Sequence, residues 1–309
     1  MKAFNALPAF ALSLALFSSA GAQPSAFDEL MGSAAPAESG LLPEPEAFSA
    51  DGAELEAFQY LPPDNDEPGF EWPPANKSAE GDFVTIGGLP TYLKASASES
   101  ESLDPGSGKC ALDSGARYEL AAKPGFEGAH MTVSLRERIP GCGLDRGYIY
   151  LPHIACSSAG GACELPRNVR AFLDTLAYAE GTRESYNYIF TFATFQSYAD
   201  HPRVRKCSGR LCSTAAGRYQ YLSTTWDGLA GPMGLSDFTP PSQDKVVVEL
   251  IRRNGAYTSV ANSANYDNFV RAVNRLNRTW ASLPGSPYGQ PTHSMSNLWK
   301  YYKAALARY

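Results

Sequence analysis

The clearest hydrophobic pattern in the chain lies in residues 167–182. Apolar side chains recur there every three or four residues, at Val169, Phe172, Leu173, Leu176 and Ala177. This spacing predicts an amphipathic helix, and Gly181 is a natural end for it. Glu180 lies about three turns beyond Val169, on the same apolar face. The pattern therefore predicts a carboxylate on the inner face of a helix, at its C-terminal end.

The rest of residues 167–309 also has mainly helical periodicity. Ser242, Gln243 and Asp244 begin one amphipathic run, residues 266–280 carry a second apolar stripe, and residues 297–309 form a third. Residues 186–198 are rich in aromatic residues and threonine, which favours a short hairpin. Roughly 140 residues are enough for one hydrophobic core. We therefore expect an α+β domain over 167–309 that is mainly helical with a small hairpin.

Residues 108–166 have a different pattern, in which short apolar-polar alternations are separated by turn residues. Residues 117–120, 130–135 and 147–151 alternate with period two, and Pro-Gly pairs follow Lys123 and Ile139. The pattern predicts a small all-β barrel. Its end, residues 147–150, resembles the last strands of bacterial SH3-type domains, which bind peptidoglycan in exported wall enzymes. A barrel that only packs on its neighbour is the alternative.

The N-terminal residues indicate export. Lys2, an apolar run over residues 9–17 and the small residues 20–22 before Gln23 are typical of a signal peptide over residues 1–22. Residues 23–107 are rich in Pro, Ala, Ser and Glu and have no sustained period, which predicts a disordered segment. No run is long enough to span a bilayer. The expected location is the periplasm or the extracellular space.

Charge is distributed unevenly behind the net value of −6. Residues 23–107 hold 17 acidic side chains against two lysines, whereas residues 167–309 hold 17 basic side chains against nine acidic ones. A basic domain suits an anionic polymer. In an exported protein we expect cell-wall glycan rather than nucleic acid as the partner, although a basic surface without a ligand is also common.

Six cysteines agree with an oxidising compartment. Proximity along the chain favours the pairs Cys110–Cys142, Cys156–Cys163 and Cys207–Cys212. Zinc is the competing interpretation, but no two cysteines have two-residue spacing, and His153 and His201 are poorly placed for one site. No metal and no cofactor is predicted, and we expect a monomer.

The expected chemistry centres on Glu180. Burial disfavours the charged form of a carboxyl group, so Glu180 should stay protonated to unusually high pH, as a general acid requires. The alternative is a structural glutamate that is capped by backbone amides or paired with a nearby arginine. Nucleophile-elbow, phosphate-loop, zinc-protease and dinucleotide-binding motifs are missing from the sequence.

Several segments resemble, in order and spacing, the lambda phage endolysin family along essentially the whole of residues 170–305. They are residues 176–182, 198–203, 213–220, 241–244, 280–285 and 288–290. The resemblance implies a lysozyme-like fold and cleavage of the β-1,4 bond between N-acetylmuramic acid and N-acetylglucosamine. The catalytic glutamate of the family, in an Ala-or-Ser, Glu, Gly, Thr motif, corresponds to Glu180.

A second carboxylate is not evident in the sequence. Asp174 lies about 240° around the helix from Glu180, Glu184 lies beyond Gly181, and Asp200 is better explained as a loop-fixing residue. One carboxylate suffices if the substrate's own 6-hydroxyl attacks, which gives a 1,6-anhydro sugar as in the resembled family. A lytic transglycosylase is therefore expected. The alternatives are a true lysozyme, including one selective for deacetylated glycan, and an inactive wall-binding protein.

The candidate substrate-binding residues lie in three places. Gly217 would allow close approach of a sugar, and Gln220 would bond its hydroxyl and acetamido groups. Two further residues have open alternatives, since Tyr219 would stack on a sugar or pack in the core, and Arg218 would bind a lactyl carboxylate or form an internal salt bridge. The remaining candidates are Tyr288 and Gln290, for which a structural turn is equally possible, and Tyr188. The last lies in the aromatic segment 186–194, which replaces a glycine-rich hairpin tip of the family and is expected to border the site.

Overall fold

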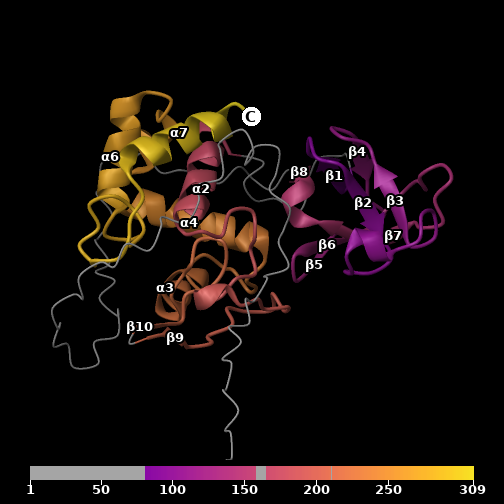
Figure 1. The fold of residues 1–309 in the computed structure, drawn as a ribbon, viewed down its shortest axis with the longest axis horizontal. Coiled ribbons are helices and arrows are strands. Elements are labelled where there is room, and N and C mark those ends of the chain that lie inside the picture. The colour runs from indigo at the N-terminus through magenta and orange to yellow at the C-terminus, as the bar shows by residue number, and fades with distance from the viewer. Residues whose placement is uncertain (1–80, 158–164, 210) are drawn as a thin grey trace, which may run out of the picture. The chain divides into compact units, whose positions relative to one another are not determined.

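A computed structural model describes residues 81–157, 165–209 and 211–309. The predicted signal peptide, residues 1–22, lies outside the described residues, and so does most of the predicted acidic segment. The described chain contains an all-β part and a mainly helical part, so the fold is mixed α and β (Figure 1). No described helix is long and apolar enough to cross a membrane.

The β part covers residues 81–157 and consists of two antiparallel sheets. One has the order β4-β1-β8 and the other the order β3-β2-β7-β6-β5. The strands are β1 (Phe83–Ile86), β2 (Thr91–Lys94), β3 (Lys109–Leu112), β4 (Arg117–Glu119), β5 (Gly125–Glu127), β6 (His130–Ser134), β7 (Arg146–Tyr150) and β8 (Ile154–Ser157), with short 3₁₀ turns η1 (Ser100–Ser102) and η2 (Leu151–His153).

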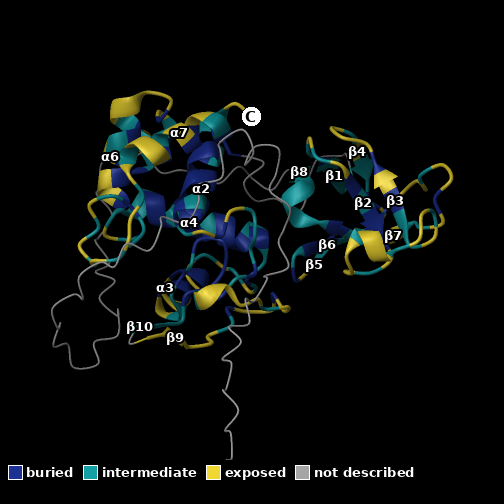
Figure 2. Cartoon of the chain, viewed as in Figure 1, coloured by how far each residue is buried: buried dark blue, intermediate teal, exposed yellow. Residues whose placement is uncertain are grey.

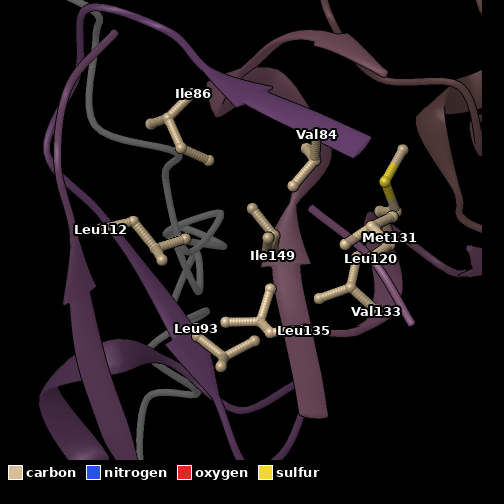
Figure 3. Packing of buried hydrophobic residues seen from close by; sticks show 9 residues of the cluster. All are labelled: Val84, Ile86, Leu93, Leu112, Leu120, Met131, Val133, Leu135 and Ile149. Carbon is tan, nitrogen blue, oxygen red and sulfur yellow. The ribbon is translucent and has the colours of Figure 1, made fainter. Parts of the chain in front are cut away.

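The inward-facing side chains of these strands form one hydrophobic core, which Figure 3 shows from close by. Val84 and Ile86 from β1 and Leu93 from β2 are almost completely buried in it, beside Ile149 from β7. The predicted domain boundary at residue 108 is therefore wrong, because β1 and β2 lie before it and belong to the same sheets as the later strands. The four-residue strands FVTI and TYLK lie between glycine, proline and acidic residues, and that context obscured their alternation.

Two of the three predicted cysteine pairs are present as disulfides. Cys110 and Cys142 join β3 to the loop before β7, with a Cα–Cα distance of 5.7 Å. Cys207 and Cys212 are directly opposite each other in a two-stranded sheet. Cys163 lies outside the described residues, so the third pair, Cys156–Cys163, stays a prediction.

The helical part covers residues 165–309. Its elements are α2 (Arg167–Ala179), η4 (Phe190–Phe192), β9 (Lys206–Ser208), β10 (Leu211–Ser213), α3 (Ser223–Ala230), α4 (Pro240–Arg253), α5 (Tyr257–Ala261), α6 (Tyr266–Leu276) and α7 (Met295–Leu306). Helix α2 packs against α7 and α5, and most of its residues are buried (Figure 2). The predicted amphipathic helix therefore runs through the hydrophobic core rather than along the surface.

The aromatic segment folds back on itself as predicted, with hydrogen bonds from Ile189 N–H to the Ala193 carbonyl and from Phe195 N–H to the Asn187 carbonyl, but it has no regular ladder. Residues 186–198 form a tight turn around η4 with an isolated bridge between Tyr188 and Thr194, not a hairpin ladder. The turn is tight because Thr191 and Phe192 both have left-handed backbone conformations, with φ of 73° and 60°. The hairpin with a regular ladder is β9–β10, which Cys207 and Cys212 cross-link.

Candidate functional site

Glu180 directly follows α2 and caps its C-terminal end. Its backbone N–H still donates to the Leu176 carbonyl at 2.9 Å, and the chain then turns away through Gly181, whose φ is +74°. Glycine adopts this left-handed conformation without steric cost, which explains the Glu-Gly pair at the helix end. The Glu180 side chain is half-buried, and the Ser282 hydroxyl donates a hydrogen bond to its Oε1 at 2.5 Å. The helix end and the loop after α6 thus hold one carboxyl group between them.

The pKa of Glu180 is raised to about 7. Burial is the dominant cause, since it disfavours the charged carboxylate, and the hydrogen bond from Ser282 acts in the opposite direction. The sequence left open that Glu180 is paired with an arginine. In the part of the chain that the structure describes, none of the salt bridges includes Glu180. A carboxyl group with this pKa can donate a proton near neutrality and can accept one after the proton has left.

A second acid of α2, Asp174, lies in a buried network of charges. Its Oδ1 accepts from Arg218 at 2.7 Å, and its Oδ2 accepts from Arg308 and from the Tyr309 hydroxyl, each at 2.7 Å. Burial alone would raise the pKa of Asp174, but the charges of Arg218 and Arg308 outweigh that effect and lower it. Asp174 is therefore an ionised structural residue.

Three of the predicted substrate-binding residues have structural roles instead. Tyr219 is fully buried, and its hydroxyl donates to Asp244 at 2.7 Å, so it cannot stack on a sugar. Arg218 is 6% exposed and bound to Asp174, which corresponds to the internal salt bridge that the sequence left open. At Gly217 a Cβ atom would lie 2.3 Å from Gln243 Oε1, so the glycine is required for packing rather than for approach of a ligand.

Gln220 and Tyr188 stay candidates because both side chains are only half-buried. Gln220 has a left-handed backbone, with φ of 50°, and its Nε2 donates to the Gly217 carbonyl at 2.9 Å and to the Tyr188 carbonyl at 3.4 Å. The two residues therefore belong to one hydrogen-bonded unit. Its amide and phenol groups are suited to a polyhydroxylated ligand.

Tyr288 and Gln290 lie in the loop after α6, which also supplies Ser282. The Tyr288 hydroxyl donates to the Arg278 carbonyl at 2.6 Å, so this side chain closes the loop on itself. That contact favours the structural-turn alternative for Tyr288. No contact described for Gln290 connects it to Glu180.

The sequence analysis missed one residue of the site, Ser282, and the structural role of Asp174. Ser282 lies in the Trp-Ala-Ser-Leu-Pro-Gly segment that matched the family, but periodicity could not indicate that it meets Glu180 from 102 residues away. The role of Asp174 was detectable in principle, because a charged residue inside an apolar helical run needs a buried partner. Within the described ranges, no group of three or more His, Cys, Asp or Glu residues could hold a metal ion.

The helical part of the chain is similar to known proteins. Residues 170–309 match the family model described as Endolysin. The endolysin of Escherichia phage lambda is 38% identical over 151 residues, which cover 46% of this chain and 93% of the relative. The endolysin of Escherichia phage P2 is 37% identical over 157 residues, which cover 45% of this chain and 93% of the relative.

Two solved structures are also similar to this chain. One is bacteriophage lambda lysozyme complexed with a chitohexasaccharide, with 38% identity, a TM-score of 0.43, and coverage of 46% of this chain and 95% of that chain. The other is lysozyme from bacteriophage lambda, with 37% identity, a TM-score of 0.41 and the same coverage.

Proposed function

The chain belongs to the endolysin family through residues 170–309, and on that premise we propose that it is a lytic transglycosylase with Glu180 as its catalytic acid. At the coarser level it is a peptidoglycan glycosidase. The proposed bond is the β-1,4 linkage between N-acetylmuramic acid and N-acetylglucosamine. The proposed product carries a 1,6-anhydro ring at the muramic acid end.

The observation that carries the proposal is the desolvated carboxyl group of Glu180 at the end of α2, held by the Ser282 hydroxyl. Breaking a glycosidic bond requires a proton on the departing oxygen, and an ordinary glutamate has lost its proton at neutral pH. Because burial raises the pKa of Glu180 to about 7, a large fraction of the molecules keep this proton near neutrality. Ser282, bonded to one carboxyl oxygen, fixes the orientation of the group.

The other carboxylates that the sequence offered are engaged elsewhere. Asp174 is buried between Arg218 and Arg308. Asp200 accepts a hydrogen bond from the His201 backbone and forms an ion pair with Arg203. With these groups held by partners, the 2-acetamido group of the substrate is the proposed stabiliser of the positively charged sugar centre.

The second step follows from the first. After donating its proton, Glu180 is a carboxylate beside the reacting sugar and can accept the proton of the 6-hydroxyl group. That hydroxyl oxygen bonds to the anomeric carbon, so the ring closes without water and the proton returns to Glu180. An intramolecular attack of this kind is favoured because the nucleophile is already in place.

Mass spectrometry of digested sacculi tests this reaction. We expect soluble muropeptides whose muramic acid end is lighter by one water molecule than the hydrolysed product. Hydrolysed muropeptides without this loss would identify a true lysozyme and reject the transglycosylase step. Binding of sacculi without any soluble product would identify an inactive wall-binding protein.

The pH dependence of the rate provides a second test. The reaction should slow as pH rises through about 7, because Glu180 then loses the proton that it must donate. In Ser282→Ala the carboxylate loses a hydrogen bond that stabilises its charged form, so the pKa of Glu180 rises further. We expect the alkaline limb of the pH-rate profile to shift to higher pH in Ser282→Ala.

Ser282→Thr is the matched control, because it keeps the hydroxyl group and should keep the wild-type limb. Release of soluble muropeptides across a pH series measures both variants. An alkaline limb that stays in place in Ser282→Ala would show that the serine does not act on the carboxyl group.

Two further parts of the proposal rest on the sequence. The protein is exported, with residues 1–22 as its signal peptide, and the two disulfides Cys110–Cys142 and Cys207–Cys212 suit an oxidising compartment. The all-β part is an SH3-type domain that binds the wall. Support for that assignment is the strand ending at residues 147–150 and the small antiparallel sheets.

A further inference from the structure

We propose that the ring of Phe192 is a stacking platform for a sugar ring of the glycan strand bound at Glu180. The inference rests on the proposed function and adds a substrate contact to it. Phe192 is 57% exposed, the largest exposure of any large hydrophobic side chain among the described residues. An exposed phenylalanine gains little from burial, so its conformation has to be explained in another way.

The Phe192 ring lies against Gly181, the residue that follows the proposed catalytic glutamate. Gly181 follows Glu180 in the chain, and a Cβ atom at Gly181 would be 3.0 Å from Phe192 Cζ and 3.3 Å from Cε1. The ring packs in a T-shaped arrangement against Tyr188, with ring centroids 5.7 Å apart and an angle of 89° between the planes. The ring is therefore supported by the Gly181 backbone and by Tyr188 while more than half of the side chain stays open.

The backbone that presents this ring is strained. Thr191 and Phe192 both have left-handed conformations, with φ of 73° and 60°, and a β-branched or bulky residue rarely adopts them. The turn is held by two hydrogen bonds, from Phe192 N–H to the Ile189 carbonyl at 2.9 Å and from Ile189 N–H to the Ala193 carbonyl at 2.8 Å. Strain that the surrounding structure enforces is typical of sites that bind or transform a ligand.

The side chains of Phe192, Tyr188 and Gln220 are chemically suited to a sugar ring. One face of a pyranose carries C–H groups, which suit an aromatic surface, whereas its edge carries hydroxyl and acetamido groups. The Gln220 amide bonds the Tyr188 carbonyl at 3.4 Å, so a polar group belongs to the same unit as the aromatic pair. An apolar platform beside a few polar groups is the usual composition of a small-molecule site. We therefore assign an N-acetylated sugar ring as the occupant.

Binding of chitohexasaccharide to the full chain tests the assignment, with Glu180→Gln as the non-cleaving parent in every variant. Adding Phe192→Asn removes the ring but keeps a residue that tolerates the left-handed backbone. We expect about three- to tenfold weaker binding by calorimetry. The melting temperature should rise or stay unchanged, because the strain is relieved. Adding Phe192→Tyr keeps a ring and should keep the affinity within about twofold.

The two measurements separate a binding role from a structural one. A merely structural Phe192 would show the opposite pattern, with a lower melting temperature and unchanged affinity, and that result would overturn the inference. Tyr266→Ala, which removes an exposed aromatic residue from α6 instead, should leave the affinity unchanged. An equal loss of affinity in Tyr266→Ala would show that the effect is not specific to Phe192.

Digestion of sacculi by the wild-type chain separates this inference from the proposed function. If the wild type releases no soluble muropeptides, the proposed function fails and the platform fails with it. If it does release them while the Glu180→Gln parent and its Phe192→Asn derivative bind the oligosaccharide equally, or neither binds, only the stacking platform is rejected.

Discussion

Replacing Glu180 with glutamine is expected to lower the rate of muropeptide release by about 10²- to 10⁴-fold. Glutamine has nearly the same shape as protonated glutamic acid, but it has no proton to donate to the departing oxygen. The variant therefore keeps the helix end while it loses the chemistry. Release of soluble muropeptides from purified sacculi measures the effect.

Glu184→Gln is the matched control for this variant. It makes the same chemical change four residues further along the chain, at a half-buried side chain whose partner is Arg308 at 3.7 Å. We expect its activity to stay within about twofold of the wild type, since Glu184 has no part in the proposed reaction and its partly exposed ion pair contributes only about 0–1 kcal/mol to stability. Full activity in Glu180→Gln would refute the catalytic assignment.

The melting temperature of Glu180→Gln as a function of pH shows that the variant folds and tests whether the pKa of Glu180 is raised in the wild type. A buried acid with a raised pKa stabilises the folded state fully below its unfolded value of about 4.5. This contribution is lost as pH rises through the folded pKa of about 7. Relative to the wild type, the melting temperature of Glu180→Gln should therefore increase between pH 5 and pH 8. A difference that does not vary with pH would show that Glu180 titrates normally.

The second large effect concerns stability. Asp174→Ala is expected to destabilise the fold by about 3–5 kcal/mol, because it leaves Arg218 buried without its ion-pair partner. Arg218 is also held by the Arg183 carbonyl, which accepts from its Nε at 2.7 Å, so it cannot easily move into solvent. Unfolding by urea, followed by circular dichroism, measures the loss.

A double variant separates the charge effect from packing. Asp174→Leu combined with Arg218→Met replaces both charges with apolar groups, and we expect it to be more stable than either single variant. If the double variant loses as much as the two single variants added together, the two residues act independently and the proposed network is absent.

The structure shows which parts of the fold could be predicted from sequence. Helix α2 was predictable because its apolar positions repeat over three turns, and the position of Glu180 on it followed directly. Strands β1 and β2 were missed because four residues are too few to establish a period between turn-forming residues. The family resemblance indicated the right segments but not the orientation of their side chains.

The site was harder to predict because its contacts join distant parts of the chain. Tyr219 and Arg218 are polar or aromatic, so the sequence could not decide between a ligand and an internal partner. In the structure both side chains are buried, and Tyr219 binds Asp244 while Arg218 binds Asp174, so both have internal partners. Ser282 reaches Glu180 only through the tertiary fold. Local patterns specify elements, whereas the pairing of polar groups depends on packing between elements.

Two carboxyl groups six residues apart, in α2 and directly after it, have pKa values shifted in opposite directions. Ionised Asp174 stabilises the domain until the pH falls to the lowered pKa of this residue. Glu180 keeps its proton until the pH rises to about 7. Between these two pKa values, on the acidic side of neutrality, the domain keeps its buried ion pairs and Glu180 keeps the proton that it donates. Mildly acidic buffers should therefore suit both long-term storage and assays of this enzyme.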